Sequence, residues 1–319
     1  MNFLHNSACA VNVGEDGKAI WATAPANIAI IKYMGKVGLN EAVNSSISYT
    51  LDKFIVKVSL RPAPDWSWHP LNADLQLSNL QQDRFFNHAK FLAKHFNIDQ
   101  SFAIGSGGNF PVNCGIASSA ASFAALTAVF GYLATKNREV SMAEITSLSR
   151  VGSGSSCRSF YKGWVLWGSQ VETCDSCFDD CISQVVLVDS SCKSVSSSAA
   201  HKRVSTSLLF ANRANRANSR LAEVIKALNE SWYNLYKLAW QDFWDMHALF
   251  HTADPAFSFI TADTMFILQT IQQYWQEHKD GPLITLDAGA NVHLLYRQDQ
   301  QDLAKKIYDL FIDKYRVIN

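Results

Sequence analysis

The segment from Gln100 to Thr135 contains no charged residue, which restricts the folds open to this chain more than any other feature. Glycine, serine, asparagine and proline dominate its first part, and only about the last fifteen positions are mainly apolar, too few to span a bilayer core. Between Ala117 and Ala134, alanine fills most of the gaps between larger apolar residues on one helical face, namely Phe123, Leu126, Phe130 and Leu133. The pattern predicts a closely packed, buried helix and no membrane segment.

Short β-branched and aromatic runs elsewhere in the first half predict strands at Trp21–Thr23, Ile28–Ile31, Phe54–Leu60 and Trp164–Trp167. In the second half, apolar residues repeat at helical spacing over Ser231–Phe250, Ile267–Trp275 and Leu303–Phe311. Leu283–Leu286 and Val292–Tyr296 have the pattern of two strands joined by a tight turn at Asp287–Asn291. Strands with one helix, followed by a helix-rich half, predict an α/β (α+β) fold with helices packed on sheets.

Length and charge narrow the class of protein further. The 319 residues fit two domains at about 150 residues each, and the Ser-rich stretch Asp189–Ser207 is expected to open the second. Lysine and arginine total 28, as do aspartate and glutamate, and only 18% of residues are charged. We therefore expect neither a disordered chain nor a broad nucleic-acid-binding surface. A single local pocket that binds an anion is still compatible with this charge balance. With seven cysteines and no signal-peptide pattern in residues 1–18, we expect a cytoplasmic protein.

A phosphate site is one interpretation of the residues that lead into the buried helix. Gly115, Ile116, Ala117, Ser118 and Ser119 join a glycine-rich stretch to the helix start. Free backbone N–H groups and the positive end of the helix dipole attract phosphate there. A serine N-cap without any ligand is about equally compatible with this pattern. The Walker A motif is absent, so an ordinary P-loop fold does not explain the segment.

Three further segments carry groups that could bind anions or move protons. The loop Gly152–Ser159 contains Arg158, whose planar fork suits a carboxylate or phosphate. An apolar strand ending near Ile31 delivers Lys32, Tyr33 and Lys36 to one place, although a basic strand end is usually solvated surface. Asp287 lies in the predicted turn, where aspartate is also a common turn former. Each of these signals is weak when taken alone.

Taken together and in order, these segments resemble the GHMP small-molecule kinase superfamily and its diphosphomevalonate decarboxylase branch. The matching pieces are Ala24–Lys36, Asn44–Leu51, Gly115–Ala120, Gly152–Ser159 and Asp287–Asn291. The resemblance implies a GHMP kinase fold with a ribosomal-protein-S5-domain-2-like domain over 1–182 and a ferredoxin-like domain over 183–319. It also implies an active site in the cleft between these domains, and a homodimer.

The resemblance implies ATP-dependent decarboxylation of mevalonate 5-diphosphate to isopentenyl diphosphate, with Mg²⁺ as a cofactor. In that reaction the 3-hydroxyl is phosphorylated before phosphate and CO₂ leave. The catalytic residues implied are Asp287, Arg158, Lys32 and Asn27, of which Arg158 also binds the substrate carboxylate. The residues implied to contact the substrate diphosphate or to lie near it are Tyr33, Lys36, Ser153, Ser155 and Ser197. Gly115 to Ser119 match the loop that cradles the ATP phosphates, and no protein side chain is expected to bind a metal.

Departures from the family pattern leave more than one substrate compatible with the sequence. Met34 replaces a tryptophan and Val43 a proline, which we interpret as packing changes. Ser198 stands where some members carry a diphosphate-binding arginine, a contact worth about 1.5 to 3 kcal/mol unless Lys202 or Arg203 compensates. A mevalonate 3-kinase or a phosphomevalonate decarboxylase on the same fold is therefore the alternative.

A non-catalytic metabolite- or zinc-binding protein is a more distant alternative. Its basis is the series Cys174, Cys177, Cys181 and Cys192, which is reminiscent of a zinc knuckle. The series lacks the two Cys-x2-Cys pairs that are usual for such a site. We therefore expect these cysteines to be reduced thiols. The joint presence of Asp287 and Arg158 also favours an enzyme.

Overall fold

The computed structural model describes residue 4 and residues 6–37, 41–72, 75, 77–110, 118–189 and 195–319. Its first half is built on a seven-stranded sheet with the strand order β1-β2-β5-β7-β6, to which β8 and β9 are joined through β5. These strands are β1 (Ala10–Val13), β2 (Ile20–Ile31), β5 (Ser46–Pro62), β6 (Ser67–Pro70), β7 (Phe102–Gly108), β8 (Trp164–Trp167) and β9 (Val171–Cys174). All pairs are antiparallel except β6 with β7. A short pair, β3 (Lys36–Val37) and β4 (Glu41–Ala42), stands apart from this sheet.

Strand β2 joins two runs that the sequence presents as separate strands. Trp21–Thr23 and Ile28–Ile31 both lie in β2, and the pairing with β5 shifts register between Pro25 and Ala26. Proline has no N–H to donate to the ladder, which explains why the regular pairing is interrupted there. The strand continues past this irregularity and past a second one between Ala29 and Ile31, and it ends at Ile31, directly before Lys32.

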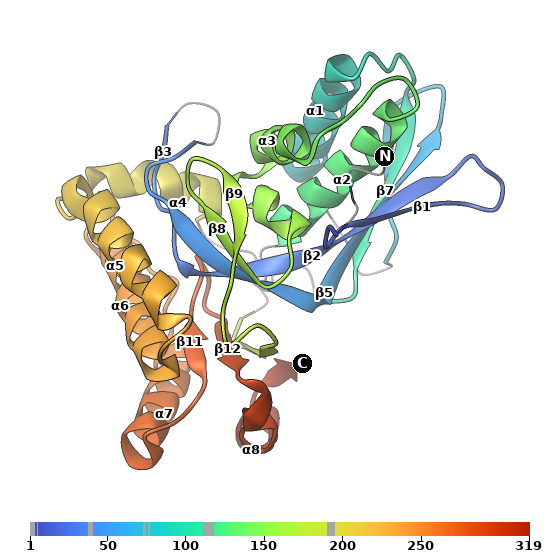
Figure 1. Ribbon diagram of the computed structural model, residues 1–319. Helices are drawn as coiled ribbons and strands as arrows, with labels where there is room; N and C mark the ends of the chain where they lie inside the picture. The colour runs from blue at the N-terminus through green and yellow to red at the C-terminus, as the bar shows by residue number, and fades with distance from the viewer. Residues whose placement is uncertain are drawn as a thin grey trace.

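Three helices cover one face of the first sheet (Figure 1). They are α1 (Asn79–His95), α2 (Ser118–Ala134) and α3 (Met142–Gly152). The predicted buried helix is confirmed as α2, which packs against β2 and β5 on one side and α1 and α3 on the other. The prediction of one helix in this half was wrong. The buried residues of α1 are Phe85, His88, Ala89, Leu92 and Ala93. Because a histidine interrupts this series, the apolar periodicity of the helix is weak in the sequence although these side chains are buried.

The second half contains a four-stranded antiparallel sheet with the order β11-β12-β10-β13. Its strands are β10 (Ile182–Leu187), β11 (Leu283–Thr285), β12 (Val292–Tyr296) and β13 (Arg316–Ile318). The helices of this half are α4 (Ser197–Arg203), α5 (Arg213–Ala227), α6 (Trp232–His251), α7 (Ala262–His278) and α8 (Gln301–Ile312), with short 3-10 turns at Val204–Thr206, Phe210–Asn212 and Gln298–Gln300. The three helices and the strand pair predicted here are confirmed, as is the mixed α/β class.

Helix α6 contacts both sheets, at β2 and at β11, and so joins the two halves of the molecule. One apolar cluster is continuous across this junction, with Ile30 from the first sheet and Ile284 from the second. A smaller cluster lies beneath α4 and includes Met34, Met246 and Phe250. Met34 is therefore a packed core residue. No helix within the described ranges is long and apolar enough to cross a membrane.

Candidate functional site

Lys32 and Asp287 meet where β2 and β11 end. Lys32 follows β2 directly, whereas Asp287 lies two residues after β11. The Lys32 Nζ atom is 2.6 Å from Asp287 Oδ1, and the lysine side chain is 3% exposed against 27% for the aspartate. Burial lowers the pKa of Lys32, and the Asp287 carboxylate opposes that shift. The arrangement presents one carboxylate, oriented by a buried ammonium, at a partly open surface.

The backbone of Lys32 is held by side chains because it lies outside regular structure. Its N–H donates to Asp242 Oδ2 at 2.7 Å. Its carbonyl accepts from an Arg213 N–H at 2.9 Å and from Asn44 Nδ2 at 3.0 Å. Backbone groups that leave a strand need other partners when they are buried, and here every partner is a polar side chain.

Arg158 is hydrogen-bonded to side chains from β2 and β5. Its Nε donates to Asn27 Oδ1 at 3.3 Å, and one terminal nitrogen donates to Ser46 Oγ at 2.6 Å. Asn27 in turn donates to Ser159 Oγ at 2.9 Å. Arg158 is 2% exposed, and burial lowers its pKa. Asn27, Ser46 and Ser159 thus fix the direction of a buried guanidinium fork.

The Tyr33 ring is packed between two aromatic side chains. The Tyr33 ring stacks on His201 at a centroid distance of 4.8 Å and meets Trp167 edge-on at 5.0 Å. His201 Nδ1 accepts from the Gly35 N–H at 3.1 Å, so α4 is tied to the segment after β2. Gly35 has a φ of +98°, a backbone conformation that favours glycine.

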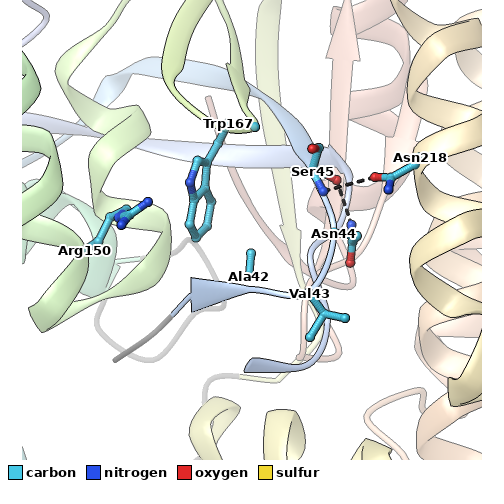
Figure 2. A pocket seen from close by; sticks show the side chains of 8 residues that line it. Ala42, Val43, Asn44, Ser45, Arg150, Trp167 and Asn218 are labelled. Carbon is cyan, nitrogen blue, oxygen red and sulfur yellow. Dashed lines mark hydrogen bonds between the residues drawn. The ribbon is translucent and has the colours of Figure 1, made fainter. Parts of the chain in front are cut away.

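A cavity of about 320 Å³ adjoins these groups. In Figure 2, Arg150 is directed toward the Trp167 ring from one side, and Asn44, Ser45 and Asn218 lie on the other. Arg150 and Arg158 lie 5.7 and 5.9 Å from the centre of that ring. The cavity shares Asn44 with the Lys32 backbone and Trp167 with Arg158. Lys32 and Asp287 themselves are not among the residues that line it.

Arg84 is a residue of this site that the sequence patterns did not reveal. It comes from α1, donates to the Gly152 carbonyl at 3.1 Å, and acts electrostatically on Tyr33 and Lys36. Burial and the charge of Arg84 together lower the pKa of Lys36 to about 8. Two cations from distant segments therefore share one region of the site. No motif marks Arg84, because only the packing of α1 beside Gly152 brings it there.

The segment 152–159 is more regular than its composition predicts. Residues Gly154–Phe160 form a 3-10 helix, so the expectation of an irregular loop was wrong. Ser156 Oγ bonds to the Ser153 carbonyl at 2.7 Å and to Ser149 Oγ at 2.6 Å, which stabilises the tight turn. Ser153 is 9% exposed, and the Ser155 carbonyl accepts from Asn27 Nδ2 at 3.3 Å. The structure thus brings Ser155 into contact with Asn27, whereas the hydrogen bonds of Ser153 are to Ser149 and Ser156.

The remaining sequence candidates that the structure describes lie at two helix starts. Ser118 and Ser119 are the first residues of α2, whereas Gly115, Ile116 and Ala117 lie outside the described residues. No acidic side chain occupies the first turn of α2, so no carboxylate of that turn repels an anion near its N–H groups. Ser197 opens α4 and is exposed, as is its neighbour Ser198.

The cysteine series does not form a metal site in the part of the chain that the structure describes. No group of three or more His, Cys, Asp or Glu side chains there is arranged to hold a metal ion. Cys177 and Cys181 donate their thiol protons to the carbonyls of Leu228 and Phe178. Burial raises the pKa of Cys181, which disfavours the thiolate that zinc requires. Cys192 lies outside the described residues.

Two family models together match nearly the whole chain. Residues 24–178 match the diphosphomevalonate decarboxylase-like N-terminal domain, and residues 184–317 match the mevalonate 5-diphosphate decarboxylase C-terminal domain. Diphosphomevalonate decarboxylase from Saccharomyces cerevisiae is 32% identical over 323 residues, covering 91% of this chain and 81% of the relative.

Solved structures show the same relationship. The crystal structure of a mevalonate diphosphate decarboxylase from Legionella pneumophila is 43% identical, covers 94% of this chain and 100% of its own, and superposes with a TM-score of 0.88. A structure described as MDDEF in complex with MVAPP, AMPPCP and magnesium is 23% identical, covers 97% and 96% of the two chains, and has a TM-score of 0.84. The latter demonstrates a shared fold.

Proposed function

Because the chain belongs to the diphosphomevalonate decarboxylase family, we propose that it converts mevalonate 5-diphosphate and ATP into isopentenyl diphosphate, ADP, phosphate and CO₂. The observation that carries this proposal is the pairing of Asp287 with Lys32 beside the buried fork of Arg158. A carboxylate for a hydroxyl proton and a cation for a carboxylate are the two groups that this reaction requires.

Asp287 is the proposed base for the tertiary 3-hydroxyl of the substrate. Its Oδ1 accepts from Lys32, and the carboxylate oriented in this way is the proposed acceptor of the hydroxyl proton. Lys32 orients the carboxylate and places positive charge where the transferred phosphoryl group gathers negative charge. Phosphorylation matters because hydroxide leaves carbon poorly, whereas phosphate leaves readily.

Arg158 is the proposed partner of the substrate carboxylate. The contacts with Asn27 and Ser46 fix its fork, so that the bound carboxylate has a defined direction. When the bond between the carboxylate carbon and the chain breaks, its electron pair forms the new double bond and expels phosphate from C3. The fixed arginine holds the breaking bond in line with that departure.

The diphosphate end of the substrate is proposed to bind the polar cluster around Tyr33. Lys36 and Arg84 supply positive charge, and Tyr33, Ser153, Ser155 and Ser197 supply hydroxyl groups. Arg84 offers a physical reason why a serine at position 198 is compatible with a diphosphate. Its charge reaches the site from α1 rather than from α4, and an arginine forms bidentate contacts with phosphate.

The start of α2 is the proposed ATP phosphate site. Ser118 and Ser119, with Gly115, Ile116 and Ala117 before them, would hold the phosphates through N–H and hydroxyl groups, and the first turn of α2 carries no acidic residue that would repel them. Mg²⁺ bound with ATP neutralises phosphate charge and polarises the transferred group. We propose no protein carboxylate as its ligand.

We also propose the domain division 1–182 and 183–319, with the active site between the two domains. Support comes from Lys32 and Asp287, which belong to opposite sides of that boundary and form an ion pair. The homodimer and the cytoplasmic location stay predictions.

The stoichiometry of the reaction tests the proposal against its alternatives. Purified protein with Mg·ATP and mevalonate 5-diphosphate is expected to release one CO₂ and one phosphate for each ADP. ADP without CO₂ would indicate a 3-kinase, the alternative that Ser198 keeps open. Turnover with the 5-monophosphate only would indicate a phosphomevalonate decarboxylase.

A further inference from the structure

Helix α6 carries one side chain that contacts the backbone of Lys32 and another that contacts the backbone of Asp287. Asp242 of α6 is fully buried and accepts the Lys32 N–H at 2.7 Å. His247, also on α6 and fully buried, contacts the Asp287 carbonyl through Nε2 at 3.2 Å. The two anchoring residues are five positions apart, which corresponds to about 7.5 Å along a rigid helix.

The contact of Asp242 with Lys32 is reinforced by Arg213. The Arg213 guanidinium binds both oxygens of Asp242 at 2.7 and 3.0 Å and donates to the Lys32 carbonyl at 2.9 Å. It also reaches Asp245 at 2.8 Å. The N–H and the carbonyl of Lys32 are thus both held by one buried ion pair, whose side chains are 0% and 1% exposed.

His247 acts on Asp287 as a neutral donor. A carbonyl oxygen only accepts, so the imidazole proton must lie on Nε2. Burial and the charge of Lys32 lower the pKa of His247 to about 3, which keeps the ring neutral at physiological pH. The Asp287 carbonyl also accepts the Gly289 N–H at 2.8 Å, so the backbone of the turn is fixed from two directions.

A third contact joins the strands that carry the pair. Thr285 Oγ1, two residues before Asp287, donates to the carbonyl of Ala29, three residues before Lys32, at 3.2 Å. The pair is therefore part of a frame in which α6 fixes the ends of both strands and the strands contact each other. Interior packing of this kind resists small displacements.

We propose that Asp242 and His247 are positioning residues, and that α6 sets the geometry of the Lys32–Asp287 pair on which turnover depends. The inference rests on the proposed function, because it assigns these residues to the same reaction. A purely structural role for His247 predicts a different result: a less stable protein whose folded fraction keeps its turnover number.

Two substitutions at His247 separate these possibilities. H247M keeps the volume but removes the donor, whereas the amide nitrogen of H247Q takes the place of Nε2. We expect H247M to lower kcat by about 100-fold with the KM for both substrates within about threefold, and H247Q to recover most of kcat. H251M, at an exposed histidine of the same helix, is the matched control and keeps wild-type kcat. An equal loss of kcat in H247M and H247Q would overturn the proposal, and so would a wild-type kcat in H247M.

A readout without turnover keeps the inference distinct from the proposed function. Acetylation of Lys32 by acetic anhydride is read by peptide mass spectrometry, with the exposed Lys90 as internal reference. H247M is expected to raise labelling of Lys32 several-fold and H247Q to leave it unchanged, whether or not the wild type forms product. Unchanged labelling in H247M contradicts the positioning role.

Arg213 gives an independent test if H247M does not fold. In R213K a single ammonium cannot contact the Lys32 carbonyl and both oxygens of Asp242 at once. We expect a lower kcat with unchanged KM and increased labelling of Lys32. Wild-type kcat and labelling in R213K would exclude Asp242 and Arg213 from positioning the pair.

Discussion

At the scale of single residues, the site contains two buried cations with different partners. Lys32 has the carboxylate of Asp287 at 2.6 Å. Within the described part of the chain, the Arg158 guanidinium donates to the neutral oxygens of Asn27 and Ser46, and the charge of Asp287 acts on it without a hydrogen bond. A buried cation without a bonded counterion is costly, and an incoming carboxylate relieves that cost. The difference explains why we assign the substrate carboxylate to Arg158 and proton chemistry to Asp287.

Replacing Arg158 tests the first assignment. In R158Q the amide keeps a donor but loses the charge, and a lost charge-assisted contact of about 1.5 to 3 kcal/mol lowers kcat/KM by about 10- to 150-fold. We expect CO₂ release to slow more than ADP release, because phosphorylation does not need the carboxylate to be aligned. Both rates are measured in one reaction, and unchanged rates would place the carboxylate elsewhere.

Replacing Asp287 tests the second assignment. D287N keeps the shape of the side chain and removes the base, so turnover is expected to vanish while ATP and mevalonate 5-diphosphate still bind. Calorimetry measures binding, and release of ADP measures turnover. Near-normal turnover in D287N contradicts a base at this position.

Lys36 gives a pH-dependent prediction. Its pKa is lowered to about 8, by burial and by Arg84, so near pH 8 about half of the lysine is charged before substrate arrives. An anionic diphosphate favours the charged form and raises that pKa, so binding takes up protons near pH 8 and weakens as the pH rises further. The Kd for mevalonate 5-diphosphate is compared between pH 7 and pH 9 in the wild type and in K36R. A wild-type Kd as insensitive to pH as that of K36R contradicts contact with Lys36.

At the scale of elements, the junction of α3 with the 3-10 helix at Gly154–Phe160 places Arg84 and Ser153. A Cβ atom on Gly152 would lie 2.2 Å from the Phe123 ring of α2, so α3 approaches α2 closely only because residue 152 is glycine. The Gly152 carbonyl is also the acceptor for Arg84. Close packing and the cation site thus depend on the same backbone position.

We expect G152A to lower the free energy of unfolding by about 1 to 3 kcal/mol, because an extra methyl group overpacks a rigid core. The KM for mevalonate 5-diphosphate should rise as well, since Arg84 and Ser153 shift with the backbone. Urea denaturation measures the first effect and steady-state kinetics the second. G108A is the control, because a Cβ atom there meets its nearest neighbour at an ordinary 3.4 Å. Wild-type stability in G152A would contradict the close contact.

Local patterns predicted the elements whose apolar period is strong and missed those whose order comes from tertiary contacts. The aromatic stripe of α6 and the alanine-rich α2 are readable because their buried positions are apolar. The stripe of α1 passes through His88, whose partner Thr127 belongs to α2, so nothing local indicates that this histidine is buried.

The same difference applies to the site. Lys32, Tyr33 and Arg158 lie in recognisable motifs, and the motifs led to their selection. Asp242 and His247 look like ordinary members of an amphipathic helix in the sequence. Their function appears only when α6 is placed behind Lys32 and Asp287, residues 255 positions apart in the chain.

At the scale of the whole molecule, the two sheets meet at α6 and at the contact between Thr285 and Ala29. Lys32 comes from the first half and Asp287, the proposed base, from the second, so the geometry of this pair depends on how the halves join. An enzyme built in this way needs both halves for turnover. We expect its choice of substrate to depend on Lys36, Arg84 and Ser197, the residues proposed to bind the diphosphate.

The measurement that tests this account most directly is mass spectrometry of the products formed with Mg·ATP from mevalonate, its 5-phosphate and its 5-diphosphate in separate reactions. Isopentenyl diphosphate is expected from the diphosphate, with no isopentenyl product from the other two. A product that keeps its carboxylate and gains a phosphate, or a product from the monophosphate alone, would contradict decarboxylation of the diphosphate.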